Sequence, residues 1–219
     1  MAYYDNNYGQ RRFLGNAPAA TRNIIIINIV VFAATWLGER LLNSDVMGRV
    51  FALYPIQSHY FHWWQFITYM YMHGGFWHIL FNMYTLYIFG CVVENIIGTK
   101  KFITFYTICG VGAAALHLLV QSLTNDFAPT VGASGSIYGV LIAFAILFPE
   151  SRLTLLFPPV TLSAKWMVII FAVIELTTGI TGAAANVAHF AHLGGMLIGW
   201  LLIKYWKGKG TLFDKQRWI

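Results

Sequence analysis

Six long apolar stretches, separated by short polar connections, constrain the fold of this chain more than any other feature. They cover about residues 23–42, 77–97, 102–123, 134–149, 166–180 and 187–205 of 219. Only 10% of the residues are charged, whereas soluble domains average roughly 25%, so lipid must solvate much of the surface. A spanning helix needs roughly 17–25 residues, which makes the fourth and fifth stretches short. The pattern predicts an all-α polytopic membrane protein, a bundle of six transmembrane helices.

The chain is expected to divide into a core of residues 23–206 between two polar tails, 1–22 and 207–219. One long connection, at about 43–76, follows the first apolar stretch and is rich in aromatic residues (Tyr60, Trp63, Trp64, Tyr69 and Tyr71). Aromatic side chains gather at membrane–water interfaces. We therefore expect this first loop to lie at the interface, with an ordinary solvent-exposed loop as the alternative.

The basic residues indicate how the chain is oriented. Twelve of the 14 lysines and arginines fall on one side of the predicted membrane: Arg11, Arg12, Arg22, Lys100, Lys101, Arg152, Lys165, Lys204, Lys207, Lys209, Lys215 and Arg217. The connections 124–133 and 182–186 contain none. Both termini are therefore expected to be cytosolic. The same distribution explains the net charge of +6 as membrane topology, so no nucleic-acid partner is expected.

The cysteines give no firm indication of the redox compartment. Cys91 and Cys109 both lie within apolar stretches and are expected to be small core residues, not a disulfide. The first 22 residues show no cleavable signal pattern. A bacterial inner membrane, with the functional site open toward the outer side, is the expected location.

Strongly polar side chains inside a membrane are costly and usually functional. His78 and Asn82 are four residues apart on one face of the second helix, Ser134 begins the fourth, and His192 lies on the sixth. At about 1.5 Å per residue, Ser134 is roughly 24 Å from the cytosolic end of its helix, Asn82 about 27 Å and His192 about 18 Å. The three helices thus place Ser, His and Asn in one layer nearer the outer leaflet.

The residues around Ser134 suit a helix that begins inside the membrane. Gly132 permits unusual backbone angles in the preceding turn, and serine is a good first residue of a helix. The free N–H groups at a helix start favour an oxyanion. Because non-helical backbone at this depth requires protein or water around it, a water-accessible cavity is expected here.

Glycines should bring the partners together. Small-xxx-small faces occur on the fourth helix (Gly135, Gly139) and on the sixth (Gly195, Gly199), and such faces allow close backbone approach. His192 is in phase with the second pair. Tyr138, one turn after Ser134, is placed to pack against the imidazole. Ser134 and His192 are therefore the candidate nucleophile and general base.

Other polar residues have competing interpretations. His189 is the alternative base, although it is out of phase with the glycines, and Ser136 is expected to pack. His117 is interpreted as a core histidine. No carboxylate is expected beside His192, so a Ser-His dyad is the simplest hypothesis; Glu175 is the one intramembrane acid candidate, with its role open. The histidine spacing does not fit the His-pair motif of a helical metalloprotease, so no metal is expected.

Three motifs together resemble the rhomboid intramembrane serine proteases: HGGFWHILFN at 73–82, GASG at 132–135 followed by Tyr138-Gly139, and AHLGGMLIG at 191–199. The resemblance covers the six-helix core. It implies Ser134 as nucleophile, His192 as base, and His78 with Asn82 at the oxyanion hole. It also implies cleavage of single-pass membrane proteins in or near their transmembrane segments, without metal or cofactor.

The resemblance also assigns parts of the fold. It implies a membrane-embedded first loop around 63–73 and a substrate gate at 166–185. His73 itself is interpreted as a structural or hydrogen-bonding residue of that loop, with contact to the oxyanion as the alternative. Many relatives carry Trp-Arg where this chain has Trp64-Gln65, which leaves the anchoring of that loop open. The oligomeric state and the natural substrate are not readable from the sequence.

Two other functions are alternatives to protease activity. A non-catalytic relative that binds membrane helices would be expected to lack the serine or the histidine, and both are present. A transporter would be expected to show inverted repeats and paired broken helices, and the sequence shows neither.

Overall fold

The computed structural model describes residues 17–124, 126–155, 159–182 and 188–212. The predicted tails 1–22 and 207–219 therefore lie largely outside the described residues. The elements, in chain order, are α1 (Ala19–Leu42), α2 (Val46–Phe51), α3 (Gln65–Thr68), the 3-10 turn η1 (Tyr69–Tyr71), α4 (Phe76–Thr85), the π-helical turn η2 (Leu86–Gly90), α5 (Cys91–Ile97), α6 (Thr99–Thr124), α7 (Ser134–Leu147), β1 (Arg152–Thr154), β2 (Thr161–Ser163), α8 (Ala164–Thr181) and α9 (His189–Gly208).

All six predicted apolar stretches are helical, and the all-α polytopic membrane fold is confirmed. Within the described residues, four helical segments are long and apolar enough to cross a membrane: α1, the continuous α4–η2–α5, α6 and α8. The apolar α7 has 14 residues, about 21 Å at 1.5 Å per residue, and is too short to cross alone. That α7 and α9 complete a set of six membrane helices stays a prediction.

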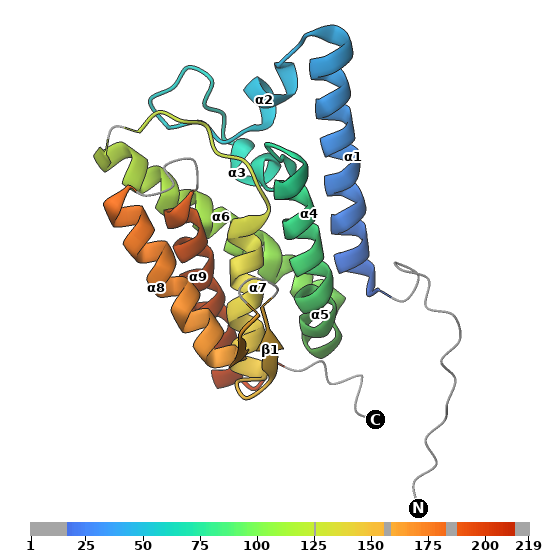
Figure 1. Ribbon diagram of the computed structural model, residues 1–219, viewed down its shortest axis with the longest axis vertical. Coiled ribbons are helices and arrows are strands. Elements are labelled where there is room, and N and C mark those ends of the chain that lie inside the picture. The colour runs from blue at the N-terminus through green and yellow to red at the C-terminus, as the bar shows by residue number, and fades with distance from the viewer. Residues whose placement is uncertain (1–16, 125, 156–158, 183–187, 213–219) are drawn as a thin grey trace, which may run out of the picture.

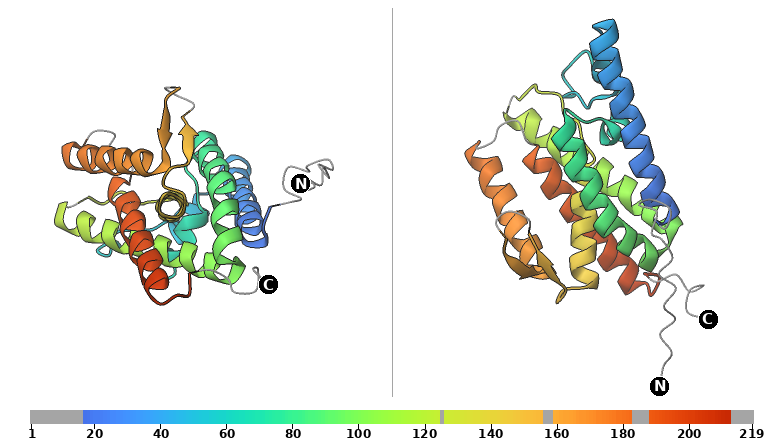
Figure 2. Two further views of the ribbon diagram at one scale, coloured as in Figure 1. Left: turned by 90° about the horizontal axis from the view of Figure 1, so that it is seen from below. Right: turned by 45° about the vertical axis from the view of Figure 1, so that its right-hand side comes forward.

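The short helix α7 stands at the centre of the bundle. Viewed nearly along its axis, it is surrounded by the other long helices, with α1 on the outside (Figure 2, left). It begins part-way down the bundle and not at its upper end (Figure 1). Its first residue is Ser134, so the fold places this serine well inside the bundle.

The first loop is held in its own folded conformation by Gln65, which is fully buried. The side-chain oxygen of Gln65 accepts hydrogen bonds from the backbone N–H groups of Tyr54 and His62, at 3.2 and 3.1 Å. Its amide nitrogen donates to the carbonyl of Tyr60 at 2.7 Å. The neutral amide therefore anchors the loop, which answers the question left by the missing arginine. Trp63 beside it is 77% exposed, as an interfacial aromatic side chain would be.

The opposite end of the bundle is stabilised by Glu94, whose side chain is 1% exposed. Its carboxylate accepts hydrogen bonds from the backbone N–H groups of Ala20 and Thr21, at 2.9 and 2.7 Å. The hydroxyls of Thr21 and Thr99 also donate to it, at 2.8 and 2.7 Å. A carboxylate suits the free N–H groups of a helix start. Glu94 thus joins the start of α1 to the end of α5 and the start of α6.

The start of α1 and the end of α9 lie at the same end of the bundle (Figure 1). Lys101, near the start of α6, donates to the carbonyl of Thr211 there, at 2.5 Å. The hairpin formed by β1 and β2 pairs Arg152 with Ser163 and also lies at this end. The described basic connections are therefore grouped at one end, and the side of the membrane that this end faces stays a prediction.

Candidate active site

The turn before Ser134 is held by backbone bonds to the first loop. Leu53 and Thr130 exchange two N–H···O bonds, at 2.9 and 2.8 Å. The N–H of Gly132 then donates to the carbonyl of Tyr69 at 3.0 Å. Gly132 itself has φ +134°, a conformation that strongly favours glycine. The loop and the turn therefore fix where α7 begins.

Ser134 and His192 are brought together from α7 and α9. The Ser134 Oγ lies 2.7 Å from His192 Nε2, a normal hydrogen-bond distance. The Tyr138 ring stacks on the imidazole with centroids 4.3 Å apart and an interplanar angle of 12°. Ser134 is partly exposed, although the adjoining Ala133 and Gly135 are buried. This serine can thus be reached while its histidine is held in place.

The four glycines identified in the sequence make this approach possible. A Cβ on Gly195 would lie 1.8 Å from the carbonyl oxygen of Gly135. A Cβ on Gly199 would lie 2.9 Å from the Cα of Gly139. No side chain fits at such distances, so α7 and α9 pack backbone to backbone, as the spacing predicts. His192 lies one turn before Gly195, which places its ring over the start of α7.

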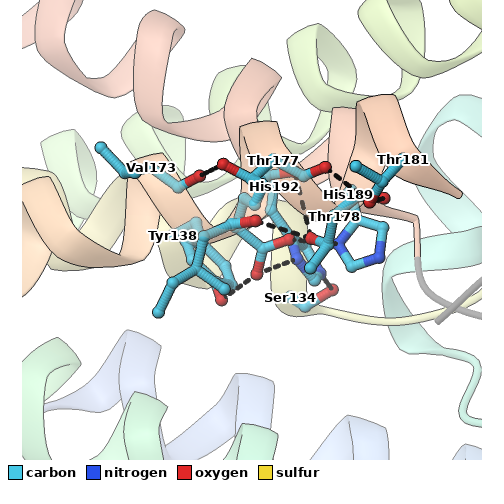
Figure 3. A network of polar contacts seen from close by, with 10 residues as sticks. Ser134, Tyr138, Val173, Thr177, Thr178, Thr181, His189 and His192 are labelled. Atoms are coloured by element: carbon cyan, nitrogen blue, oxygen red, sulfur yellow. Dashed lines mark hydrogen bonds and ion pairs between the residues drawn. The ribbon is translucent and has the colours of Figure 1, made fainter. Parts of the chain in front are cut away.

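The structure corrects the expectation that no carboxylate lies beside His192. Glu175 of α8 places its Oε1 2.9 Å from His192 Nδ1, and its Oε2 2.6 Å from His189 Nδ1. Tyr138 donates its hydroxyl to Oε1 at 2.5 Å. The contact with His192 is a close charge approach, not a well-aligned hydrogen bond. Figure 3 shows Tyr138, His189 and His192 gathered near Ser134 within one polar network.

Sequence reasoning missed this contact because it depends on how α8 is rotated. The segment is apolar on nearly all sides, so its pattern selects no face. The available signal was that Glu175 is the one acid between residues 164 and 181. An intramembrane carboxylate is a functional-site candidate by default.

His78 and Asn82 lie on one face of α4. His78 Nε2 and Ser134 Oγ lie 2.8 and 3.6 Å from the point that a Cβ on Gly132 would occupy, so both groups border the same small space. Asn82 is 8% exposed, and its Nδ2 has no hydrogen-bond partner among the described residues. A buried amide donor without a partner costs about 1–3 kcal/mol, so it is a donor available to a ligand.

His73 precedes α4 in the first loop and lies outside the spanning helices. Its ring is buried, and it packs edge-on against His78 with centroids 4.9 Å apart. Burial, and to a smaller degree the neighbouring His78, lower the pKa of His73 to about 3. The side chain is therefore neutral at physiological pH. The structure shows this side chain packed against His78, and its structural role stays a prediction.

The remaining candidates have structural contacts. Ser136 is fully buried and lies 3.2 Å from the sulfur of Met70, so it packs, as predicted. His117 Nε2 lies 2.6 Å from the Thr130 hydroxyl and thereby holds the segment that leads to the Ser134 turn. The described cysteines, Cys91 and Cys109, are both free.

Glu175, His189 and His192 also place their ligand atoms within 4.8 Å of one another, as a metal site would. Hydrogen-bond and ion-pair distances of 2.6 and 2.9 Å already account for this cluster. The Nε2 of His192 faces Ser134. The arrangement suits proton transfer from a hydroxyl to an imidazole that a carboxylate supports.

Comparisons with known proteins agree with these motifs. The family model of the Rhomboid domain matches residues 60–207. Presenilin-associated rhomboid-like protein, mitochondrial, of Rattus norvegicus is 32% identical over 145 residues, 64% of this chain and 38% of that protein. Rhomboid protein 1, mitochondrial, of Saccharomyces cerevisiae is 30% identical over 147 residues, covering 66% and 42%. RHOMBOID-like protein 1 of Arabidopsis thaliana is 31% identical over 166 residues, covering 76% and 40%. The match spans about two fifths of each relative.

Proposed function

The chain belongs to the rhomboid family, and from this premise we propose that it is an intramembrane serine endopeptidase that uses Ser134 as nucleophile and His192 as general base. The observation that carries the proposal is the 2.7 Å contact between Ser134 Oγ and His192 Nε2. A weak nucleophile such as serine needs a base within hydrogen-bond reach. Here the two groups lie within a bundle of apolar membrane helices, where other membrane proteins can reach them. The substrates proposed are therefore single-pass membrane proteins, cut in or near their transmembrane segments.

The reaction follows from the positions of these groups. Ser134 Oγ forms a bond to the scissile carbonyl carbon while its proton moves to His192 Nε2. The imidazolium then gives that proton to the departing amine nitrogen as the C–N bond breaks. A water molecule next attacks the acyl-enzyme and loses a proton to His192. The Ser134 ester bond breaks, and Oγ takes the proton back.

Three donors are proposed to stabilise the oxyanion: the backbone N–H of Ser134 at the start of α7, the His78 ring and the Asn82 amide. Donors of this kind act because they are fixed before charge develops. The unpartnered Nδ2 of Asn82 and the approach of His78 to Gly132 support this assignment. Gly132, Gly135, Gly195 and Gly199, with Tyr138 and His73, are proposed to hold this arrangement.

For topology, we propose that the core extends over 23–206 and that the end bearing the basic connections faces the cytosol or its equivalent. The site then opens toward the other side. The chain is an integral membrane protein. The bacterial inner membrane expected from the sequence is not proposed further, because two of the three relatives described are named as mitochondrial and the third is from a plant.

The test is cleavage of a model single-pass substrate in detergent, with labelling of Ser134 by a fluorophosphonate. Ser134→Ala and His192→Ala are each expected to abolish cleavage. Ser136→Ala is the matched control, since this serine lies two residues away and packs against Met70; it should retain cleavage and labelling. Undiminished cleavage by Ser134→Ala would refute the proposed nucleophile. If the wild-type protein neither cleaves nor labels, it is a non-catalytic relative.

A further inference from the structure

The carboxylate of Glu175 stands out among the polar groups of the bundle because its contacts with the described residues all belong to the site. Tyr138 and His192 contact Oε1, and His189 contacts Oε2. Glu175 comes from α8, whereas these partners come from α7 and α9. It is 7% exposed. One buried carboxylate therefore joins three helices at the base of the candidate dyad.

We propose that Glu175 is a positioning residue for His192, which makes the site a Ser134–His192–Glu175 triad. This inference rests on the proposed function and names a third member of the same site. The carboxylate does not contact Ser134. It acts through the imidazole, whose two nitrogens face opposite partners: Nε2 faces Ser134 Oγ at 2.7 Å, and Nδ1 faces Glu175 Oε1 at 2.9 Å.

This placement decides which nitrogen of His192 carries the proton at rest. An ionised carboxylate only accepts hydrogen bonds, so a neutral imidazole beside it is favoured with the proton on Nδ1. Nε2 then has a free lone pair directed at the Ser134 hydroxyl. When Nε2 takes the serine proton, the ring becomes an imidazolium 2.9 Å from a negative charge. The carboxylate thus selects the competent tautomer and stabilises the charge that forms, without itself taking a proton.

A purely structural role explains this residue less well. A carboxylate inside a membrane helix is expensive to bury, and an apolar side chain would join α8 to α7 and α9 at lower cost. Glu94 shows what a structural buried glutamate does in this protein, because its partners are backbone N–H groups and two threonine hydroxyls. Glu175 instead contacts the candidate base and the tyrosine that stacks on it.

The experiment compares Glu175→Gln and Glu175→Asp with wild type, using steady-state cleavage and the rate of fluorophosphonate labelling of Ser134. Glutamine keeps the shape and one acceptor oxygen but loses the charge and the second acceptor, whereas aspartate keeps the charge but is shorter. If the carboxylate positions and supports His192, activity follows the order Glu, Asp, Gln. For Glu175→Gln we expect kcat and the labelling rate to fall together by about 10²–10⁴-fold, with KM changed less than about threefold.

The matched control is Glu94→Gln, which also neutralises a buried glutamate. Glu94 lies in α5, at the end of the α4–α5 segment that is far from His78 and Asn82. Glu94→Gln should lower thermal stability and leave kcat per folded molecule near that of wild type. Glu175→Gln should show the reverse, a folded protein with a slow chemical step.

The proposal is overturned if Glu175→Gln has wild-type kcat per folded molecule, or if activity follows the order Glu, Gln, Asp, which is the order that packing alone predicts. It is also overturned if a chelator abolishes wild-type labelling and Zn²⁺ restores it, because the cluster would then be a metal site. These results leave the nucleophile untouched, since Ser134→Ala tests it separately. An active Ser134→Ala, in contrast, refutes the protease mechanism itself.

Discussion

Replacing Gly195 with alanine tests how tightly the reaction depends on the packing of α7 against α9. The added Cβ would lie 1.8 Å from the Gly135 carbonyl oxygen and 2.7 Å from its carbon. Both are backbone atoms, so no flexible side chain can move away. Restoring an ordinary contact requires the two helices to separate by about 1.5 Å, since interiors are close-packed. Overpacking of this kind typically costs about 1–3 kcal/mol.

The same separation acts directly on the proposed chemistry. His192 lies one turn before Gly195, and Ser134 is the residue before Gly135, so the helices carry the two groups apart as they move. A contact of 2.7 Å lengthened by about 1 Å is no longer a hydrogen bond. Misplacement by about 1 Å can cost about 10²-fold in rate. We therefore expect Gly195→Ala to lower kcat at least about 100-fold.

The assay measures kcat per folded molecule and fluorophosphonate labelling, with the melting temperature recorded for the same preparation. Gly208→Ala is the control, because it lies in the same helix and a Cβ there meets nothing within 4 Å. It should change neither activity nor stability. A Gly195→Ala protein that folds and cleaves at the wild-type rate would contradict the close approach of α7 and α9.

Four further results are expected. Asn82→Ala should lower kcat about 10²–10³-fold with little change in stability, measured by cleavage and melting, because it removes one oxyanion donor. Glu94→Gln should lower the free energy of unfolding by about 1–3 kcal/mol, measured in detergent, because it leaves backbone N–H donors of α1 without an anionic partner. The pKa of His73 is lowered to about 3 in the folded protein, so the neutral ring stabilises the folded state. The free energy of unfolding should therefore fall as the pH drops from about 6.5 toward 3, since the unfolded chain binds the proton first. His73→Phe should flatten that part of the curve of stability against pH. With Cys91 and Cys109 replaced by alanine, Asp126→Cys and Lys100→Cys should react with a membrane-impermeant thiol reagent from opposite sides of the membrane. Reaction of both variants from the same side would refute the topology.

Much of this fold could be predicted from the sequence, because it depends on residues that act on their immediate neighbours. Each apolar stretch became a helix, because length and apolarity suffice to specify a helix in lipid. The glycine spacing of α7 and α9 predicted their close approach, because the absence of a side chain lets the facing backbone come nearer. The same spacing selected His192 over His189, and the structure brings His192 to Ser134 at 2.7 Å.

Interactions that depend on loops and helix rotation could not be predicted in this way. Gln65 left the anchoring of the first loop open, because its four hydrogen bonds reach backbone groups of residues 50–62 that only a folded loop brings together. The position of Glu175 depends on the rotation of α8 about its axis. Lipid is as apolar as the helices that α8 packs against, so the sequence of α8 has no periodic pattern that indicates which face points inward.

Glu94 and Glu175 show why the identity of a partner matters more than burial. Both acids lie in helices and both are nearly inaccessible, although the sequence singles out only Glu175 as an intramembrane acid. Glu94 accepts hydrogen bonds from N–H groups that any helix start exposes. Its removal should therefore lower the stability of the bundle, whether or not a reaction takes place. Glu175 faces an imidazole whose other nitrogen contacts a partly exposed serine, so the effect of its charge should be largest when that imidazole becomes protonated. A charge that stabilises the transition state more than the resting protein lowers kcat, when it is removed, more than it lowers the melting temperature. Comparing the two glutamates therefore distinguishes an effect on stability from an effect on the reaction.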